Sequence, residues 1–494
     1  MQQVERTMRS EYLERREDIL LAQREWEVTP LRARVAVIAR LRKTMALGAR
    51  ELAETVPTNS PGGLHRTVAD TLGSEIVPLL GACRFVEREA QRILKTKRLG
   101  LKGRPVWMTG VHSEVERAAL GVVLVVGAGN YPLLLAGVQT IQALVAGNAV
   151  LWKPAPGTAA TAHALRTLLV ECGLNPDLLT LIETDVECVS EAIAAGVDHV
   201  VLTGSAQTGK AVLRQLAETL TPATMELSGC DSVFVLPGAE LEHMMRAIGF
   251  GLRFNGSFTC MAPRRVFLVE LSEGEAAQVE ARLAAMAREL EPVPLPVKTE
   301  ELLRGLIADA RGQGAEIVLD NVGGGEASGR AGATLIYRAT PAMLAMQTDI
   351  FAPILSVMRT ADVGEALAAN GACAYALTAA IFGPEAEARR LARRLRVGNV
   401  LINDIVIPTV DPRVAFGGRG RSGFGVTRGA EGLLAMTAPR TVQVQRGRIA
   451  FPYQATGDGH VELFGGLAKM LYSDGIGNRW DGLKRLIRAG RKLR

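Results

Sequence analysis

The sequence predicts an α/β fold with two doubly wound parallel sheets and a small exposed ribbon. Short runs of apolar, often β-branched residues alternate with longer stretches whose apolar residues have helical spacing. This alternation is typical of parallel strands joined by right-handed helical crossovers. It occurs twice, across residues 120–228 and again across 229–425. The 494-residue chain is 48% hydrophobic, which is enough apolar material for two cores.

The elements before the first sheet differ in pattern. Residues 1–100 include LRARVAVIARLRKTMALGARELAETV, with apolar residues at helical spacing, and the turn-rich PTNSPGG at 57–63. We expect this helical lead-in to belong with the first sheet. Residues 101–119 include RPVWMTG and the alternating SEVERAA, with Gly110 between them. They predict a hairpin or exposed ribbon that leads into a buried strand.

The strands of each sheet are predicted from their apolar runs. In the first series these runs are GVVLVV, NAVLWK, LLTLIE, HVVLTG and SVFVLP, separated by helical stretches such as LLLAGVQTIQALVAG. In the second series they are RRVFLVEL, AEIVLD, ATLIYR, PILSVMR, ALTAAIFG and GNVLIND. Residues 426–494 form a return segment and end in WDGLKRLIRAGRKLR. This tail places Leu483, Leu486, Ile487 and Leu493 on one face of a basic amphipathic helix.

Composition and charge exclude several functional classes. The net charge is +6, but the last fourteen residues contribute +5 of it, and aromatic residues are only 4% of the chain. A nucleic-acid-binding surface is therefore not expected. The six cysteines are scattered without a C-x-x-C pair, so no metal site or disulfide framework is predicted. No apolar run approaches the length of a membrane span, which favours a cytoplasmic protein.

Two strand-to-helix turns are rich in glycine. GAGNYP follows GVVLVV, where a dinucleotide-binding fold has G-x-G-x-x-G, but Pro132 replaces the third glycine. The next strand ends in Lys153, where that fold usually has an acid. TGSAQTG carries Gly204, Ser205 and Gly209 at a turn whose free N–H groups can hold a phosphate. Each turn alone is equally consistent with an ordinary tight turn, and together they favour a nucleotide.

The segment NGSFTC carries Cys260 between two apolar runs. A free cysteine is usually a small buried hydrophobe. Here its neighbours are polar and turn-forming, and Arg264 and Arg265 would favour a thiolate. No histidine is close in sequence, so activation would need backbone amides, a cationic cofactor ring or a carboxylate acting through water. Glu226 in MELSG is a candidate for that carboxylate, although an acid at such a polar interruption is more often a solvated loop residue.

Taken together, these segments resemble the aldehyde dehydrogenase superfamily over about residues 20–445. GAGNYP is similar to the W-N-F-P segment, which makes Asn130 the oxyanion-hole amide. LWKPAPGT is similar to K-P-x-x-x-T, which makes Lys153 a contact of the cofactor ribose, and TGSAQTG is similar to the G-S-x-x-x-G turn. MELSG is similar to E-L-G-G, with Glu226 as general base, and NGSFTC to N-x-G-Q-x-C, with Cys260 as nucleophile.

The resemblance continues beyond the cysteine, with some departures. DIFAPILSV is similar to E-x-F-G-P-V, with Asp349 in place of the ribose-binding Glu and Phe351 against the nicotinamide. GNVLIND and FGGRGRSGFG are similar to two further family signatures. Pro156 and Asp349 stand where ribose-binding glutamates are common, which leaves both NAD and NADP open. Ser257 and Phe258 replace Gly-Gln and suggest an apolar substrate tunnel. The passage IETDVECVSEAIAAGVDHVVLTGS lacks the family's usual glycine-rich loop and resembles the class that acts on fatty and aromatic aldehydes.

The resemblance implies a domain plan and an activity. Residues 1–100 and 120–228 would form a Rossmann-like cofactor domain, 101–119 an oligomerisation ribbon, 229–425 the catalytic domain, and 426–494 the return segment and tail. The implied reaction is NAD(P)-dependent oxidation of an apolar aldehyde, medium-chain, long-chain or aromatic, to a carboxylic acid. It would run through a thiohemiacetal and a thioester on Cys260.

Three questions remain open at this stage. An acylating or reductive relative would use coenzyme A thioesters, but such enzymes generally lack the deacylating carboxylate that Glu226 would supply. A catalytically silent scaffold would not need Cys260, Glu226 and Asn130 together. The chain is expected to form a homodimer or tetramer through the ribbon. Its basic tail could contact a membrane surface, or dock on its own subunit as many terminal helices do.

Overall fold

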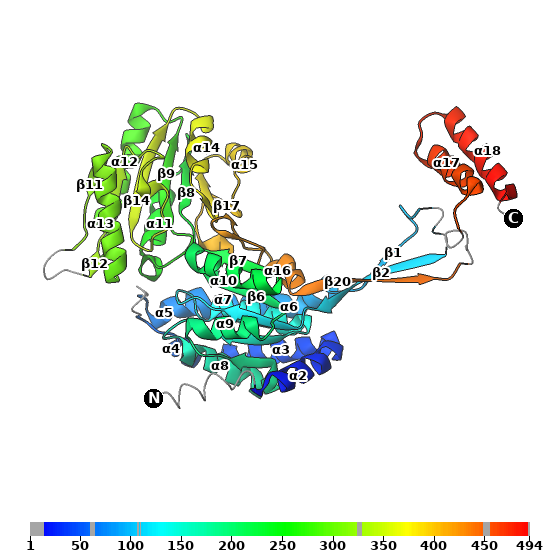
Figure 1. Cartoon of the computed structure of the whole chain (residues 1–494). Coiled ribbons are helices and arrows are strands. Elements are labelled where there is room, and N and C mark those ends of the chain that lie inside the picture. The colour runs from blue at the N-terminus through cyan, green and yellow to red at the C-terminus, as the bar shows by residue number, and fades with distance from the viewer. Residues whose placement is uncertain are drawn as a thin grey trace. The chain divides into compact units, whose positions relative to one another are not determined.

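The computed structural model describes residues 14–59, 65–105, 108, 110–323, 329–447 and 455–492. These residues divide into two compact units, one within residues 1–95 and 116–440, the other within 96–115 and 441–494 (Figure 1). The first unit contains both parallel sheets. Leu493, which was predicted for the apolar face of the tail, lies outside the described residues.

The first unit opens with helices. Their buried residues recur every three or four positions, as in Ile38, Leu41 and Met45, because one face of each helix is covered by the protein core. Helix α6 packs against both α3 and the first helix of the sheet, in agreement with the predicted helical lead-in. The bounds are α2 (Arg16–Val28), α3 (Leu31–Leu47), α4 (Ala49–Glu54), α5 (Val68–Thr71), the π-helix η1 (Leu72–Ile76) and α6 (Val77–Ile93).

The first sheet has the strand order β19-β7-β6-β3-β4-β5. Its neighbours are parallel except at the edge, where β19 is antiparallel to β7. The predicted doubly wound sheet is thus confirmed. Its elements are β3 (Val122–Val126), α7 (Leu134–Ala146), β4 (Ala149–Lys153), α8 (Ala159–Glu171), η3 (Pro176–Leu178), β5 (Leu179–Leu181), α9 (Val186–Ala194), β6 (His199–Gly204), α10 (Ala206–Thr219), β7 (Ala223–Leu227) and β19 (Gly423–Phe424).

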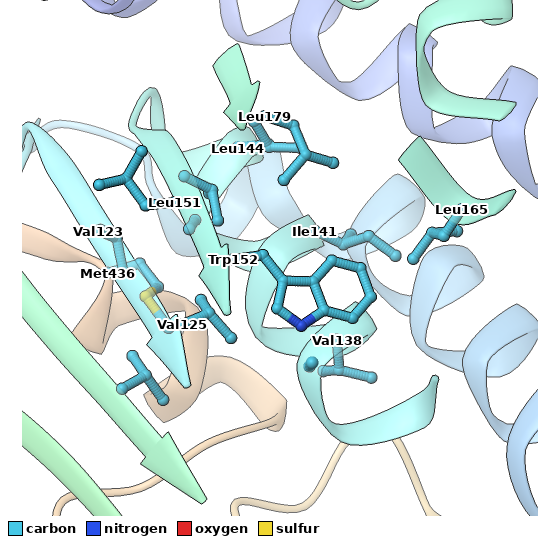
Figure 2. Packing of buried hydrophobic residues seen from close by; sticks show 14 of the residues in the cluster. Val123, Val125, Val138, Ile141, Leu144, Leu151, Trp152, Leu165, Leu179 and Met436 are labelled. Carbon is cyan, nitrogen blue, oxygen red and sulfur yellow. The ribbon is translucent and has the colours of Figure 1, made fainter. Parts of the chain in front are cut away.

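The core of this sheet is dry and continuous. Every residue of β3, β4 and α7 is buried, which explains why these segments read as unbroken apolar runs. Figure 2 shows the Trp152 indole of β4 beside Val138 and Ile141 of α7, with Leu165 of α8 nearby. Burial of such side chains supplies about 2–3 kcal/mol each. This packing holds the ends of the strands in fixed positions.

The second sheet has the order β11-β13-β14-β9-β8-β16-β17, and only its edge strand β11 is antiparallel to its neighbour. Its strands are β8 (Asp231–Val235), β9 (Pro263–Val269), β11 (Glu316–Leu319), β13 (Thr334–Tyr337), β14 (Ile354–Thr360), β16 (Thr378–Phe382) and β17 (Asn399–Ile402). Its helices are α11 (Leu241–Arg253), η4 (Phe254–Ser257), α12 (Glu273–Arg288), α13 (Val297–Gly312), η6 (Leu344–Met346), α14 (Val363–Gly371), α15 (Glu385–Ala392) and η7 (Ile407–Val410). The second predicted sheet is confirmed as well. The assignment of SVFVLP to the first series is wrong, because this run forms β8, which pairs with β9 and β16 in the second sheet.

The return segment closes the first unit. It contains α16 (Gly429–Ala435), and β19 directly precedes it. Two further short antiparallel pairs are β10 (Val293–Pro294) with β12 (Arg330–Ala331) and β15 (Tyr375–Ala376) with β18 (Arg419–Gly420). The interpretation of Glu226 as a residue of a polar interruption is wrong, because Glu226 lies inside β7 between β6 and β19. The short MELSG segment has no run of apolar residues that would predict a strand. It is a strand because it pairs with β6 and β19 in the sheet.

The second unit holds the ribbon and a helical hairpin. The ribbon is a three-stranded sheet of order β1-β2-β20, and the sequence predicted only β2 of it. Its third strand comes from the return segment, more than 300 residues later in the chain. No helix among the described residues is long and apolar enough to span a membrane. The bounds are β1 (Lys97–Leu99), β2 (Val111–Ala119), β20 (Thr437–Gln445), α17 (Asp458–Tyr472) and α18 (Ile476–Lys492).

Candidate active site

The first sheet brings the predicted site segments to one edge. Its strand order places β6 on one side of β3 and β4 on the other, so successive crossovers diverge there. Ligands of open parallel sheets bind at the carboxyl ends of the strands at such a point. Asn130 follows β3, Lys153 ends β4 and Gly204 ends β6, while Glu226 lies near the end of β7. Topology alone therefore gathers four residues spread over about a hundred positions.

Cys260 and Glu226 line the same cavity. It has a volume of about 310 Å³ and also contains Tyr131 and Arg428. Most of its wall is apolar, and includes Leu134, Leu135, Phe250, Phe254, Val406 and Ile407. A nucleophile and a carboxylate therefore share one largely apolar chamber, which agrees with the apolar tunnel expected from the sequence.

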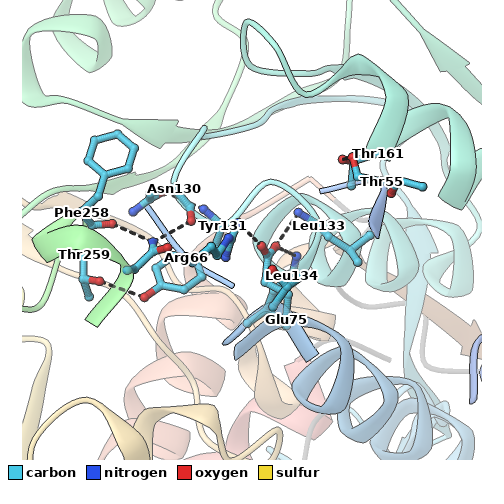
Figure 3. Close-up of polar contacts among 12 residues, drawn as sticks. Thr55, Arg66, Glu75, Asn130, Tyr131, Leu133, Leu134, Thr161, Phe258 and Thr259 are labelled. Carbon is cyan, nitrogen blue, oxygen red and sulfur yellow. Dashed lines mark hydrogen bonds and ion pairs between the residues drawn. The ribbon is translucent and has the colours of Figure 1, made fainter. Parts of the chain in front are cut away.

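The loop that carries Cys260 is sharply turned. Asn255, Gly256 and Ser257 have φ angles of +56°, +67° and +62°, a region that non-glycine residues rarely adopt. The Asn255 side chain supports this turn, because its Nδ2 donates to the carbonyl oxygens of Asn130 at 2.9 Å and Phe258 at 3.1 Å (Figure 3). A single amide thus joins the Cys260 loop to the loop after β3.

A second hydrogen bond joins the same two loops. The hydroxyl groups of Tyr131 and Thr259 lie 2.9 Å apart, and both residues are buried (Figure 3). The Asn130 side chain is 6% exposed, and its Oδ1 accepts from the Tyr131 backbone N–H at 3.1 Å. The amide oxygen of Asn130 is thus occupied as an acceptor. The NH2 group of the same amide is the donor that can bind an oxyanion.

A buried acid fixes the start of α7, directly after Asn130 and Tyr131. Glu75 of the π-helix accepts the backbone N–H groups of Leu133 at 2.7 Å and Leu134 at 2.9 Å. Its other oxygen lies 2.5 Å from the Arg66 guanidinium, and both side chains are fully buried (Figure 3). A carboxylate at a helix N-terminus satisfies orphan donors and favours the positive dipole end. Glu75 therefore positions the oxyanion loop from behind.

Glu226 is held by residues far along the chain. The Thr427 hydroxyl donates to Glu226 Oε2 at 2.9 Å, and Gln139 Nε2 lies 3.5 Å from the same oxygen. Oε1 has no hydrogen-bond partner among the described residues. Burial raises the pKa of Glu226, and Arg428, Thr427 and Gln139 act in the opposite direction. The carboxyl group is thus protonated more readily than that of an exposed glutamate.

The glycine-rich return segment packs directly on the strand of Glu226. Gly423 in β19 pairs with Glu226 and has a φ of +100°. A Cβ at this position would lie 1.9 Å from the carbonyl oxygen of Met225. Only glycine fits so close to a neighbouring strand. The FGGRGRSGFG segment, which the resemblance identified by pattern alone, therefore supports the general-base candidate.

The surroundings of Cys260 favour its protonated thiol. Burial raises its pKa, and the carboxylates of Glu226 and Asp231 raise it further, while Arg428 acts in the opposite direction. Arg264 also favours the thiolate, as expected from the sequence, because its guanidinium and the Cys260 thiolate attract each other. Burial outweighs this attraction. Both guanidinium groups are themselves buried: Arg264 donates to Ser257 in the loop of Cys260, and Arg265 donates to the Cys230 carbonyl.

The remaining cofactor candidates lie at the ends of β4 and β6. Ser205 is exposed and caps α10, and its Oγ accepts from the Thr208 N–H at 3.1 Å. A Cβ on Gly209 would lie 2.9 Å from Leu227, so this glycine lets α10 pack on β7. Burial lowers the pKa of Lys153, and Asp185 opposes that shift. A cation at the end of one strand and a helix N-terminus at the end of another are donors that fit the ribose and phosphate groups of a dinucleotide.

Asp349 and Phe351 approach from the second sheet. The Ser228 hydroxyl donates to Asp349 Oδ2, while Oδ1 is buried and has no partner among the described residues. Burial raises the pKa of Asp349, and the Ser228 hydroxyl opposes this. Phe351 is half-buried and meets Phe258 edge to face, with ring centroids 4.7 Å apart. Asp349 therefore contacts a residue just after Glu226, and Phe351 contacts a residue just before Cys260.

Sequence reasoning missed Gln139, Thr427, Arg428 and Tyr131. Gln139 had a detectable signal, because it is a polar residue inside the otherwise apolar LLLAGVQTIQALVAG, and it is 1% exposed. Thr427 and Arg428 follow directly after the glycine-rich signature, but nothing local indicates that they reach the Glu226 cavity. Their role depends on pairing between β19 and β7. No group of three or more His, Cys, Asp or Glu able to hold a metal ion occurs in the described residues.

Comparison with known proteins places this site in a family. A family model described as the aldehyde dehydrogenase family matches residues 2–442. The 4,4'-diapolycopene aldehyde oxidase of a Methylomonas species is 29% identical over 461 residues, covering 91% of this chain and 85% of that protein. The chain belongs to the aldehyde dehydrogenase family, whose members are oxidoreductases. The family resemblance drawn from the sequence is thereby confirmed.

Solved structures show the same fold. A Mycobacterium tuberculosis aldehyde dehydrogenase in complex with NAD+ matches with a TM-score of 0.76 and 24% identity, covering 86% of this chain and 88% of that one. The NADP-dependent glyceraldehyde-3-phosphate dehydrogenase of Bacillus halodurans C-125, in complex with NADP, matches with a TM-score of 0.77 and 25% identity. That match covers 87% of this chain and 91% of the other.

Proposed function

We propose that the protein oxidises an apolar aldehyde to its carboxylic acid with Cys260 as nucleophile, Glu226 as general base and Asn130 as oxyanion donor. The observation that carries this proposal is the shared cavity of about 310 Å³, which contains both the thiol and the buried carboxyl group. A thiol whose pKa is raised needs a base to become a nucleophile. Glu226 is a titratable carboxyl group of the same cavity.

The first half of the reaction forms a covalent adduct. Ionised Glu226 takes the Cys260 proton through a water, and Sγ attacks the aldehyde carbon. The carbonyl oxygen becomes an oxyanion that accepts hydrogen bonds from the Asn130 amide and the Cys260 backbone N–H. When bound, the oxidised nicotinamide supplies the hydride acceptor, and the carbon on Cys260 is left as a thioester.

The second half releases the acid. Glu226 deprotonates a water, which attacks the thioester carbon and forms a second oxyanion in the same donor set. Collapse of that adduct breaks the C–S bond, and the thiolate recovers its proton. The bond from Thr427 to Oε2 leaves Oε1 of Glu226 as the oxygen that can accept a proton from water.

The proposed cofactor is NAD or NADP. Lys153, Gly204, Ser205 and Gly209 lie at the carboxyl edge of the first sheet, where a dinucleotide binds in doubly wound folds. Asp349 and Phe351 are proposed to contact its ribose and nicotinamide from the second sheet. The related solved structures hold NAD+ in one case and NADP in the other. Both therefore remain candidates for this chain.

An apolar substrate, of medium or long chain or aromatic, is supported by the wall of the cavity. Phe250, Phe254, Leu135 and Ile407 offer no charge to a polar aldehyde. The name of the Methylomonas relative also refers to an apolar polyene aldehyde. We place the enzyme in the cytoplasm, because the proposed catalysis needs the thiol of Cys260 in its reduced form.

The test compares wild type with Cys260→Ala and Glu226→Gln, using aldehydes of increasing chain length with NAD and with NADP. We expect no reduced cofactor from Cys260→Ala. Glu226→Gln should lose steady-state turnover by about 10²- to 10⁴-fold. Cys172→Ala, which removes a thiol at the end of α8, is the matched control and should keep wild-type rates.

The same assay distinguishes the rival functions. Acid formation without coenzyme A would exclude an acylating enzyme, whereas strict dependence on coenzyme A would contradict the role of Glu226. A protein that neither reduces cofactor nor reacts with an aldehyde-mimicking electrophile at Cys260 would be a silent scaffold. Strict dependence on coenzyme A and a silent scaffold would each contradict the proposed function.

A further inference from the structure

The hairpin of α17 and α18 is a compact element with one face covered and one open. The two helices lie side by side (Figure 1) and approach closely at two glycines. A Cβ on Gly466 would lie 2.9 Å from the Gly482 carbonyl oxygen, and a Cβ on Gly482 would lie 2.4 Å from the Met470 backbone nitrogen. Ala489 is fully buried in the same contact. This packing fixes which side of each helix faces outward.

The outward side is apolar on both helices. On α17, Val461 is 69% exposed, Phe464 47% and Tyr472 73%, at spacings that keep them on one face. On α18, Ile476 is 88% exposed, Trp480 60% and Ile487 55%, again at helical spacing. Such a cluster of large exposed apolar side chains, including Trp and Tyr, marks an interaction surface.

Unpaired cations lie along one side of the exposed apolar side chains of α18. On a helical wheel, Lys484 and Arg491 fall on one side of the line through Ile476, Trp480 and Ile487. Within the described residues, Lys484, Arg488 and Arg491 form no ion pair. The one acid of this helix, Asp481, is already engaged by Lys469 at 2.8 Å and by Arg485 at 3.3 Å. The outward face therefore combines apolar anchors with free positive charge.

We propose that this face of the hairpin binds an anionic membrane surface. Helices that lie in the membrane interface carry this combination, because apolar side chains enter the acyl boundary while Lys and Arg reach the headgroup phosphates. Trp480 and Tyr472 suit the headgroup level, where amphipathic rings concentrate. Neither helix needs to cross the bilayer, and no described helix could do so.

Charge favours this occupant over a second copy of the chain. Two copies packed through the same face would bring Lys484, Arg488 and Arg491 near their own equivalents, which is unfavourable. An anionic lipid surface neutralises the same cations. The proposal is independent of the proposed dehydrogenase reaction, because none of these residues lines the Cys260 cavity.

The test is flotation of the full-length protein with vesicles of pure phosphatidylcholine and with vesicles containing about 30% phosphatidylglycerol. Wild type should float with the anionic vesicles at low salt and dissociate at about 0.5 M salt. Lys484→Ala combined with Arg488→Ala should lower the partition coefficient by about tenfold or more. Trp480→Ser combined with Ile487→Ser should lower it by at least as much, because it removes buried apolar area.

The matched control is Arg393→Ala combined with Arg394→Ala, two exposed cations at the end of α15, which should float like wild type. Turnover of a water-soluble aldehyde by each variant confirms folding. Equal binding to neutral and anionic vesicles, or no binding to either, would overturn the proposal. A change of oligomeric state in the hairpin variants, seen by light scattering with no vesicle binding of wild type, would assign the face to a contact between copies.

Discussion

Thr427, which belongs to the return segment, influences the pKa of the proposed general base Glu226. Its hydroxyl donates to ionised Glu226, which lowers a pKa that burial raises. Because Glu226 must be ionised to accept a proton, activity is expected to rise with pH through this pKa. Thr427→Val removes the donor and keeps the shape, so the pKa rises further. The acidic limb of the kcat–pH profile should move to higher pH.

The control for this shift is Thr437→Val. Thr437 is also buried in the return segment, but its hydroxyl donates to the Leu434 carbonyl instead of to Glu226. Its pH profile should match wild type. A movement of the Thr427→Val limb to lower pH would contradict the assigned role of Glu226.

Asn130 is expected to act only where negative charge develops. Asn130→Ala should lower kcat by about 10²- to 10³-fold. The affinity for the cofactor, followed by fluorescence quenching, should change little. Asn255→Ala is the informative comparison, since it removes the support of the Asn130 carbonyl and not the oxyanion donor. It should lower the melting temperature with a smaller loss of kcat, whereas Asn130→Ala should lower kcat far more than its lost hydrogen bond to the Tyr131 N–H lowers stability.

At the scale of elements, the pairing of β19 with β7 decides whether the general base is held. Gly423→Ala would place a methyl group 1.9 Å from the Met225 oxygen, so the two strands must separate. We expect a loss of about 2–4 kcal/mol in the free energy of unfolding. Activity should fall with it, because Thr427 leaves Glu226. Thermal unfolding and steady-state assays measure both effects.

Gly477→Ala provides the same chemical change without a clash. Gly477 lies in α18 with no atom near its missing Cβ, so the substitution should be neutral or slightly stabilising. Equal losses in both variants would show that the close approach of β19 to β7 is not the cause.

Elements also show where sequence reasoning succeeded. Runs such as GVVLVV and NAVLWK are strands because both faces are buried, and an unbroken apolar run is a local signal of that state. β7 and β20 gave no such signal. β7 is short and contains the polar residues Thr224 and Glu226, and β20 is exposed along nearly its whole length. Both become strands through partners that are distant in the chain.

At the scale of the whole molecule, the ribbon carries the proposed oligomer contact. β20 forms an edge of the three-stranded sheet and exposes Val442 and Val444 on one side. Such an edge recruits another strand unless it is covered. We expect light scattering to give at least twice the monomer mass. Val442→Glu combined with Val444→Glu should yield monomers.

Val297→Glu serves as the control for this change, since Val297 is 70% exposed at the start of α13 in the first unit. It should leave the mass unchanged. A wild-type protein that is monomeric at all concentrations would contradict the proposed homodimer or tetramer.

The sequence by itself determined the two parallel sheets, the family and the candidate residues Cys260, Glu226 and Asn130, because each depends on a local run or motif. Only the tertiary structure decided the electrostatic state of the site. The carboxylates that raise the pKa of Cys260, and the Thr427 and Gln139 contacts of Glu226, come from strands that meet through sheet order. Charge and burial depend on distance in space, which spacing along the chain does not contain.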